Sequence, residues 1–515
     1  MSIRKFRHII IAFIILMIIL LGVVTFINPP SIFPDASKGF QVMRSMQMGG
    51  GFNLLIGPNP DDISKNTAQF LTWWTPGQYF IPYIFKSIFH LNIGQASALT
   101  ISLFELLGLA GFYFFFKKIG FTDIIATLSL LFIMGQVAFV LPYVYYNGGE
   151  LLLFGFEGWF LYGCIALQKP GLKQVAFVLL AGWIGFFCKS SFMWIYAAGL
   201  LCLWIRLSGR SKLISFIKNG LWIGIPATFS LACIYLFFLS KGDNPAASSA
   251  DFHFTWQAFC FPLASPLLSG FSVDDLFQGL VNHPQQPYYV IVIVLLISAA
   301  ISLALIASII YHVPDKNYRL FVITYYSVSV VFFTVVFLRG LNISYEGRHL
   351  RMIGLLIVPG TIYLFRQYKP VWQAVFIVIC TGIALTSGLY LVKGYNFNNN
   401  ISAKGNSGLA EQFIDQQALN YLMQLDRRNK NAVFVFFNAQ LGLEILHNRI
   451  INLDAPANWS TIDYGDFTYD GHAGPLYILF PAKYKPIPIV LKCFPGYRDF
   501  TPINISRHFT LYAAK

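Results

Sequence analysis

The chain has 515 residues, of which 56% are hydrophobic and only 11% are charged. Soluble globular proteins are usually about 25% charged, so this composition excludes a soluble body and predicts a protein that lipid surrounds. A formal net charge of +14 would suggest a nucleic-acid partner in a soluble protein. Here the basic residues gather in short loops between apolar runs, and we therefore expect no nucleic-acid partner.

Apolar runs long enough to cross a hydrocarbon core of roughly 30 Å recur along the chain. The first run follows Arg4, Lys5 and Arg7 and has no small-residue cleavage site after it, which favours an uncleaved span over a signal peptide. The sequence thus predicts a polytopic α-helical membrane protein with about eleven spans. Two of the spans, 174–188 and 190–206, are short and could instead form one bent element. The predicted spans cover residues 8–28, 93–116, 122–141, 149–168, 174–188, 190–206, 216–239, 289–311, 319–338, 352–366 and 371–393.

The short loops that carry Lys and Arg all fall on one side of the predicted spans, which the positive-inside rule makes cytoplasmic. The N-terminus is then cytoplasmic, and the longer loops 29–92, 240–288 and 339–351 are extracytoplasmic together with the tail. For a bacterial source this predicts the plasma (inner) membrane. We expect a transmembrane domain over 1–394, a linker rich in Asn, Ser and Gly over 395–407, and a small extracytoplasmic α/β domain over 408–515.

The first outer loop, 29–92, is too long for a simple connector. Asp35 lies just beyond the first span, where a carboxylate could take a proton from an acceptor hydroxyl as a general base; the alternative is that it caps a following helix. Asp61 and Asp62 follow Gly57-Pro58-Asn59-Pro60, so turn chemistry explains them, and a second catalytic acid or a metal ligand is the other reading.

Aromatic residues flank a Pro-Gly turn at the end of the same loop. Trp73, Trp74 and Tyr79 could present ring faces to a sugar, but anchoring at the membrane interface also enriches Trp and Tyr. Both readings stay open.

Two further candidates are charged residues beside or inside spans. Glu150 and Glu157 lie on one helical face at the start of a span, where carboxylates are costly and often functional. Lys189, flanked by Ser190 and Ser191, suits a phosphate, although a lysine that reaches back to the interface explains it as well.

The segment from Arg339 to Arg351 holds three arginines and a histidine on the predicted outer side, against the positive-inside rule. A lipid-linked phosphate or pyrophosphate is the partner that this segment predicts, because arginine forks bind phosphate oxygens in pairs. Its candidate contacts are Arg339, Arg348, His349 and Arg351. Structural pairing of Arg348 with Glu346 is the alternative.

Taken together, these motifs resemble the GT-C superfamily of integral-membrane glycosyltransferases, especially the bacterial aminoarabinose and protein mannosyl transferases. The resemblance rests on Pro34-Asp35, Trp74-Thr75-Pro76-Gly77, Lys189 and Arg348-His349. It implies that Asp35 is the catalytic base or positions the acceptor, that Lys189 and Arg348 hold the carrier phosphate, and that Asp61 or Asp62 supplies a second acid. The sequence departs from the commoner pattern at Gly347-Arg348-His349, where an Arg-Tyr pair is more usual, and at its Pro-Gly turn, where relatives often have His-Pro-Pro.

The resulting hypothesis is a glycosyltransferase that moves a sugar from a polyprenyl-phosphate carrier to a glycan, lipid or protein acceptor on the outer face. No cofactor is expected, and a divalent metal stays open. The alternatives are a transporter or flippase of lipid-linked saccharides, which commonly shows internal repeats, and a non-catalytic envelope assembly protein.

Overall fold

The computed structural model describes residues 3–209, 212–242, 252–281, 287–341, 343–453, 467–483 and 488–515. The chain forms two compact units. The first, which we call the helical unit, comprises Met1–Leu21, Ser102–Pro142 and Gly149–Val392. The second, the mixed unit, comprises Gly22–Ile101, Tyr143–Gly148 and Lys393–Lys515.

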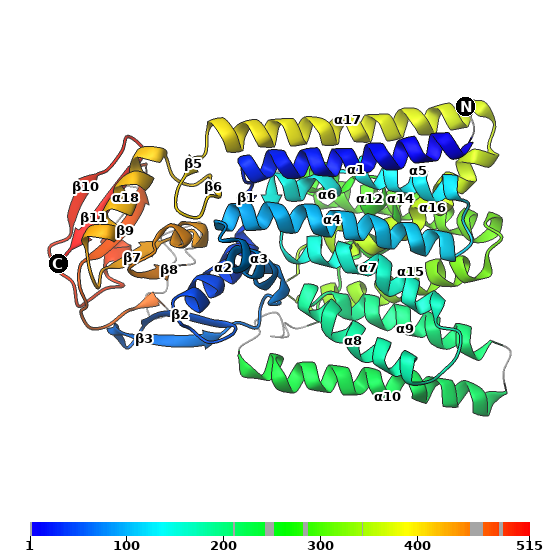
Figure 1. Cartoon of the computed structure of the whole chain (residues 1–515), viewed down its shortest axis with the longest axis horizontal. Helices are drawn as coiled ribbons and strands as arrows, with labels where there is room; N and C mark the ends of the chain where they lie inside the picture. The colour runs from blue at the N-terminus through cyan, green and yellow to red at the C-terminus, as the bar shows by residue number, and fades with distance from the viewer. Residues whose placement is uncertain are drawn as a thin grey trace. The chain divides into compact units, whose positions relative to one another are not determined.

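Long helices make up most of the helical unit, and Figure 1 shows many of them running roughly along one direction. Their bounds are α1 (Ile3–Ile27), α4 (Ile93–Lys118), α5 (Asp123–Met134), α6 (Val137–Val140), α7 (Gly149–Ala166), α8 (Leu172–Cys188), α9 (Phe192–Ser208), α10 (Leu213–Phe237), α11 (Trp256–Leu263), α12 (Ser265–Gly270), α13 (Asp274–Val281), α14 (Tyr288–His312), α15 (Lys316–Leu338), α16 (Arg351–Gln367) and α17 (Pro370–Asn400). Three short 3-10 turns accompany them: η1 (Leu141–Tyr143), η2 (Leu239–Lys241) and η4 (Gly347–Leu350).

Seven helices in the described part of the chain are long and apolar enough to cross a membrane. The number rises to eight if α5 and the segment Val137–Tyr143, which bend by 68° at a short break, count as one span. The chain is therefore a polytopic helical membrane protein. Helices α8 and α9 are apolar but have only 17 residues each, so the figure of about eleven spans stays a prediction.

Sequence features explain how several of these helices start and pack. Asp315 caps α15, because its Oδ1 accepts a hydrogen bond of 2.9 Å from the backbone N–H of Tyr318. Gly158 allows α7 to press against α4, since a Cβ atom there would lie 2.4 Å from the backbone nitrogen of Phe112. Most of α7 is consequently buried, which fixes its first turn relative to the neighbouring helices.

The predicted outer loop 240–288 contains helices that the sequence analysis did not anticipate. Helices α11 and α12 pack against α14, α15 and α16, and Phe261 and Ala264 are fully buried there. Pro262 lies inside α11, and Pro266 lies in the first turn of α12. Prolines at this spacing limit each helix to one or two turns, so no span-length apolar run marks them in the sequence.

The mixed unit combines short helices with β-structure. Its N-terminal part contains β1 (Ser31–Ile32), α2 (Pro34–Gln47), the hairpin strands β2 (Leu54–Asn59) and β3 (Asp62–Phe70), α3 (Gly77–Phe89) and β4 (Tyr145–Tyr146), which pairs in parallel with β1. Its C-terminal part contains β5 (Ala403–Lys404), β6 (Ala410–Glu411), α18 (Gln416–Arg428), β7 (Val433–Phe436), η5 (Ala439–Glu444), β8 (Arg449–Asn452), β9 (Leu476–Pro481), α19 (Pro488–Leu491), β10 (Thr501–Asn504) and β11 (Phe509–Ala514).

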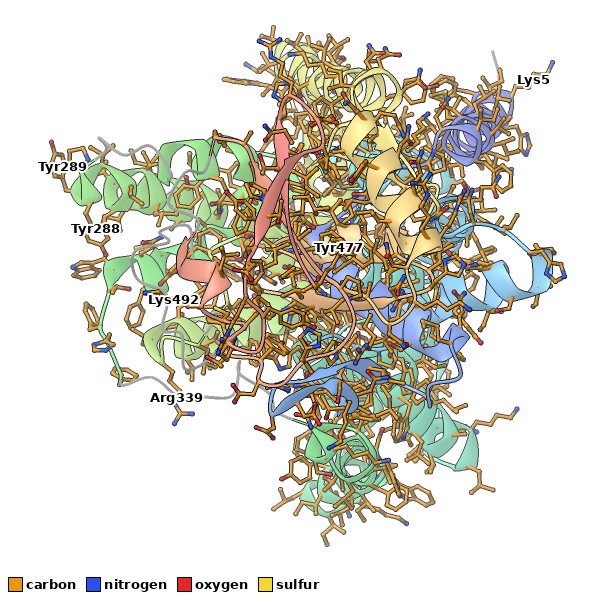
Figure 2. All side chains as sticks on the ribbon, turned by 90° about the vertical axis from the view of Figure 1, so that its left-hand side faces the viewer. Lys5, Tyr288, Tyr289, Arg339, Tyr477 and Lys492 are labelled. Atoms are coloured by element: carbon orange, nitrogen blue, oxygen red, sulfur yellow. The ribbon has the colours of Figure 1, made fainter. Side chains whose placement is uncertain are left out.

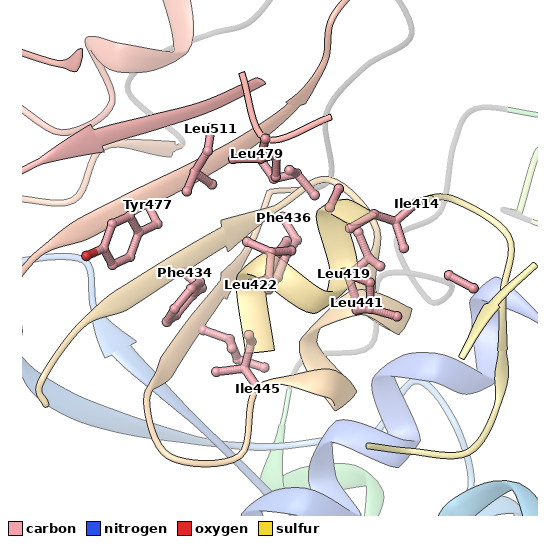
Figure 3. Close-up of a cluster of buried hydrophobic side chains, with 14 of the residues drawn as sticks. Ile414, Leu419, Leu422, Phe434, Phe436, Leu441, Ile445, Tyr477, Leu479 and Leu511 are labelled. Atoms are coloured by element: carbon pink, nitrogen blue, oxygen red, sulfur yellow. The ribbon is translucent and has the colours of Figure 1, made fainter. Parts of the chain in front are cut away.

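Five of these strands form one sheet in the order β10-β11-β9-β7-β8. Strand β7 runs parallel to β8 and β9, whereas β11 runs antiparallel to β9 and β10. Helix α18 begins at the N-cap Asp415 and packs its apolar face on this sheet, with Leu419 and Leu422 beside Phe434 and Phe436 (Figure 3). The α/β character expected for the tail is therefore present.

Polar contacts tie the N-terminal part of the mixed unit to its C-terminal part. Gln41 in α2 donates a hydrogen bond of 2.6 Å to the carbonyl of Ala439, and Arg44 donates to the carbonyls of Ile445 and Asn448 at 2.6 Å. Helix α17 continues as far as Asn400, so the first residues of the linker predicted over 395–407 are helical. The apolar part of α17 is followed by polar residues that are still helical up to Asn400.

Candidate active site

Three charged segments of the helical unit meet where helices begin and end. Glu150 lies in the first turn of α7, Lys189 is the C-cap residue of α8, and Arg348 lies in η4 directly before α16. Gly149 favours this approach, because a Cβ atom there would be tightly packed, 3.0 Å from the carbonyl oxygen of Cys188 and 3.3 Å from Cβ of Lys189. The start of α7 can therefore reach the end of α8.

Two cations converge on one carboxylate oxygen in this cluster. Oε1 of Glu150 accepts a hydrogen bond from Nζ of Lys189 and lies 3.3 Å from Nη1 of Arg348. The three side chains are 11%, 18% and 28% exposed in the order Glu150, Lys189, Arg348, so water screens these charges only partly. Arg348 also pairs through Nε with Glu346. The structural pairing of Arg348 and the candidate phosphate site therefore belong to one network. We call Glu150, Lys189, Arg348 and Glu346 the charge cluster.

His349 adjoins the charge cluster as a neutral side chain. Burial, together with the positive charges of Lys189 and Arg348, lowers the pKa of His349 to about 3, and Glu150 opposes this shift only in part. Its Nε2 atom is buried and has no hydrogen-bond partner among the described residues. At neutral pH the imidazole therefore offers one N–H donor and one acceptor beside two fixed positive charges.

Arg351 interacts more strongly with two other carboxylates of the helical unit than with Glu150 of the charge cluster. Its guanidinium lies 4.7 Å from the ring centre of Phe154, and it attracts Glu105 and Glu157. Both carboxylates are buried, and neither oxygen of Glu105 has a hydrogen-bond partner in the described part of the chain. Buried carboxylates need a counter-charge, and the structure assigns Arg351 to that role more directly than to a substrate contact.

Asp35 lies in the first turn of α2 in the mixed unit and is half-buried. The helix-cap alternative for Asp35 is wrong, because Phe33 occupies the N-cap position and Pro34 begins the helix. The helix N-terminus nevertheless favours a negative charge at Asp35. Asp35 thus lies in the first turn of the helix without being its N-cap residue.

Asp61 and Asp62 lie at the turn of the β2–β3 hairpin, where local bonds account for them. The backbone N–H of Asp61 donates to Oδ1 of Asn59 at 2.9 Å, and Asp62 accepts from Ser64 and pairs with Lys65 at 2.9 Å. Hydrogen bonds from Ser64 and Lys65 lower the pKa of Asp62 to about 2. Turn chemistry therefore explains both residues. In the described part of the chain, no group of three His, Cys, Asp or Glu side chains is placed to hold a metal ion.

The aromatic candidates of the first loop have different environments. The ring centres of Trp73 and Trp74 lie 5.6 Å apart, and Nζ of Lys38 lies 5.3 Å and 5.8 Å from them. Trp73 is 41% exposed, whereas Tyr79 is fully buried and donates its hydroxyl hydrogen bond to Asn53. The two tryptophans can thus offer ring surface to a ligand, and Tyr79 serves as a core residue.

Arg339 is the remaining predicted contact. It is the C-cap residue of α15, it is exposed, and Figure 2 shows its side chain extending outward. The sequence grouped Arg339 with Arg348 because both lie in one charged loop. In the structure Arg339 ends α15 and Arg348 lies in η4, and Tyr345 between them stacks on Phe337 with ring centres 4.1 Å apart.

No family model and no curated protein matches this sequence. Solved structures do match it along nearly its whole length. ArnT from Cupriavidus metallidurans bound to undecaprenyl phosphate superposes with a TM-score of 0.51 at 14% identity, covering 98% of this chain and 97% of ArnT. The apo form of the same ArnT gives 0.53 at 13% identity. The chain has the GT-C fold.

Arabinofuranosyltransferase AftD from mycobacteria matches the same fold with a TM-score of 0.51 at 11% identity, covering 98% of this chain but 40% of AftD. Within this GT-C fold, the structure brings together Glu150, Lys189, Arg348 and His349 in the helical unit. Asp35 and the two tryptophans belong to the mixed unit. Sequence reasoning identified all of these residues, but it did not foresee that Glu150 would bridge the two cations.

Proposed function

We propose that this chain is a membrane glycosyltransferase that moves a sugar from a polyprenyl-phosphate carrier to an acceptor on the outer face of the membrane. The convergence of Lys189 and Arg348 on a single anionic oxygen is the observation that carries the proposal. An arginine and a lysine around one oxyanion make a ready phosphate site, and ArnT, which has the same fold, was solved with undecaprenyl phosphate.

The chemistry is a displacement at the anomeric carbon of the donor sugar. A bond forms between the acceptor oxygen and the anomeric carbon while the bond from that carbon to the phosphate oxygen breaks. The leaving polyprenyl phosphate takes the electron pair, and the proton of the acceptor hydroxyl goes to the carboxylate of Asp35. Phosphate is a good leaving group, so the main requirements are a base, a phosphate clamp and correct positioning.

Several of the candidate residues have a role in this scheme. Lys189 and Arg348 bind the carrier phosphate and stabilise its growing negative charge, and neutral His349 supplies a hydrogen bond beside them. Trp73 and Trp74 offer ring faces to a saccharide. Asp61 and Asp62, for which the resemblance implies a second acid, take a structural role in this scheme because of their turn contacts.

The proposal includes an orientation in the membrane. Basic residues such as Lys117 and Lys118 at the end of α4 favour a cytoplasmic location for that end and for the N-terminus. Glu150 and Lys189, at the start of α7 and the end of α8, then lie on the extracytoplasmic side with the domain proposed for 408–515. A bacterial plasma membrane, with either hexosyl or pentosyl transfer, fits this arrangement.

Release of polyprenyl phosphate tests the function directly. The purified chain and its Asp35→Asn variant would be incubated with a panel of polyprenyl-phosphate sugars and with lipid, glycan and peptide acceptors. We expect the parent to release polyprenyl phosphate only when an acceptor is present, and the variant to lose this activity while it still binds the carrier. Turnover that persists in the variant would remove Asp35 from the mechanism. Absence of turnover with every donor, together with movement of the lipid between leaflets, would favour a flippase.

A further inference from the structure

We propose that Glu150 is an internal competitor of the carrier phosphate: it occupies the phosphate position on Lys189 and Arg348, and lipid phosphate must displace it. The inference rests on the proposed function, because it assigns the same two cations to phosphate. It adds a residue that sets the affinity for the donor and the release of the product.

The geometry of Glu150 imitates that of a bound phosphate oxygen. One oxygen, Oε1, contacts both Nζ of Lys189 and Nη1 of Arg348, and the carboxylate is only 11% exposed. A carboxylate and a phosphate present similar anionic oxygens to lysine and arginine donors. Neither cation can direct the same N–H bonds to a phosphate while Glu150 holds them.

The charges of the cluster support displacement. Lys189 and Arg348 supply two positive charges, and Glu150 and Glu346 supply two negative charges. His349 is neutral, since its pKa is about 3. The cluster is thus already balanced without a ligand. A phosphate that entered with Glu150 still in place would bring an uncompensated negative charge into a site that water screens poorly.

Competition by Glu150 lowers the affinity for donor and product by the same factor, and it matters most for the product, which binds the two cations more tightly. The donor is a phosphate diester with one negative charge. The product is a monoester, which carries about 1.5 to 2 negative charges at pH 7 and therefore binds two cations more tightly. The return of Glu150 to Lys189 and Arg348 replaces the cation contacts that the product must give up. Since product release limits many enzymes, Glu150 is expected to favour turnover.

A purely orienting role for Glu150 predicts the opposite effect. If the carboxylate only held Lys189 and Arg348 in place, its removal would let both side chains move and would weaken phosphate binding. The direction of the change in affinity therefore separates the two roles.

The test measures binding of a short-chain polyprenyl phosphate and of inorganic phosphate to the full-length protein in detergent. Glu150→Gln and Glu150→Ala should bind both ligands about tenfold more tightly than the parent, the size expected from losing one charge-assisted competitor. Glu150→Asp, which keeps the charge, should stay close to the parent. In turnover, Glu150→Gln should lower both KM and kcat because the product leaves slowly.

Asp123→Asn is a matched control, since Asp123 also pairs with two cations, Lys117 and Arg7, outside the charge cluster. Its phosphate affinity should equal that of the parent. Unchanged or weaker binding by folded Glu150→Gln and Glu150→Ala would overturn the inference and leave the proposed function standing if the parent still turns over. A parent and variants that all fail to bind polyprenyl phosphate would overturn the phosphate assignment itself.

Discussion

Oε1 of Glu150 lies 3.3 Å from Nη1 of Arg348, although 198 positions separate the two residues in the chain. The contact joins the start of α7 to the turn before α16 and, through Lys189, to the end of α8. Three helices thereby place charged side chains at one point of the helical unit. A membrane protein gains little from such charges structurally, which supports a ligand-binding role.

Arg348→Lys should impair phosphate binding although the substitution keeps the positive charge. The guanidinium contacts Glu150 through Nη1 and Glu346 through Nε, and a single ammonium cannot direct donors both ways. We expect kcat/KM to fall about tenfold in Arg348→Lys and about 10²–10³-fold in Arg348→Ala, as for loss of one transition-state donor. Arg366→Ala, at the exposed far end of α16, is the arginine control and should retain parental kcat/KM.

Asp62→Asn should leave turnover nearly unchanged, in contrast to Asp35→Asn. A carboxylate whose pKa is about 2 is a weak base at neutral pH, and Asp62 is already engaged by Ser64 and Lys65. We expect Asp35→Asn to lose about 10²–10⁴-fold in kcat, the usual contribution of a general base. Initial rates with saturating donor make this comparison. A large loss in Asp62→Asn would restore it as the second acid.

Most span-length helices could be predicted from the sequence because lipid exposure demands long apolar runs. The run 93–116, for example, corresponds to α4 (Ile93–Lys118). The break in 122–141 was not foreseen, since apolar residues continue through Gly135 and Gln136, where the chain bends by 68°. Apolar composition reports contact with lipid or core, and it does not report where a helix changes direction.

The sequence singles out the individual candidate residues, but it does not reveal which of them pair. Lys189 and Arg348 stand out because cations are rare on the predicted outer side. Glu150 bridges them from the start of α7, where Gly149 packs so tightly that a Cβ atom would lie 3.0 Å from the carbonyl oxygen of Cys188, and no local pattern reveals such packing. The hydrogen bond from Gln41 to Ala439 is similarly hidden, because it joins two polar segments that have no periodic signal.

Trp73→Ala and Trp74→Ala should each raise KM for a saccharide acceptor about three- to tenfold, as expected for the loss of one aromatic contact. The two rings lie together beside Lys38, and Trp73 is 41% exposed. Affinity for polyprenyl phosphate should stay unchanged, because the phosphate contacts proposed here lie in the helical unit. Acceptor titrations at fixed donor concentration measure the effect. Unaltered KM in both variants would assign the tryptophans to membrane anchoring.

A buried carboxyl pair in the mixed unit predicts how stability depends on pH. Glu411 and Glu444 are 0% and 1% exposed, and their carboxyl groups interact directly with each other. Burial and then the charge of Glu444 raise the pKa of Glu411 well above its usual value, and burial also raises the pKa of Glu444. The carboxylate of Glu444 is partly stabilised, since it accepts a hydrogen bond of 3.2 Å from the backbone N–H of Ser407.

Glu411→Gln should therefore stabilise the protein at pH 8. A carboxyl with a raised folded-state pKa holds its proton when the unfolded chain has lost it, so the parent loses stability as pH rises above about 4.3, the ordinary pKa of Glu. The variant has no proton to lose at this position. Its unfolding temperature should exceed that of the parent at pH 8, and the difference should vanish near pH 4. Asp499→Asn, at an exposed site, should keep the pH profile of the parent. A variant that unfolds at a lower temperature than the parent throughout this range would show that Glu411 is ionised and paired in the folded protein.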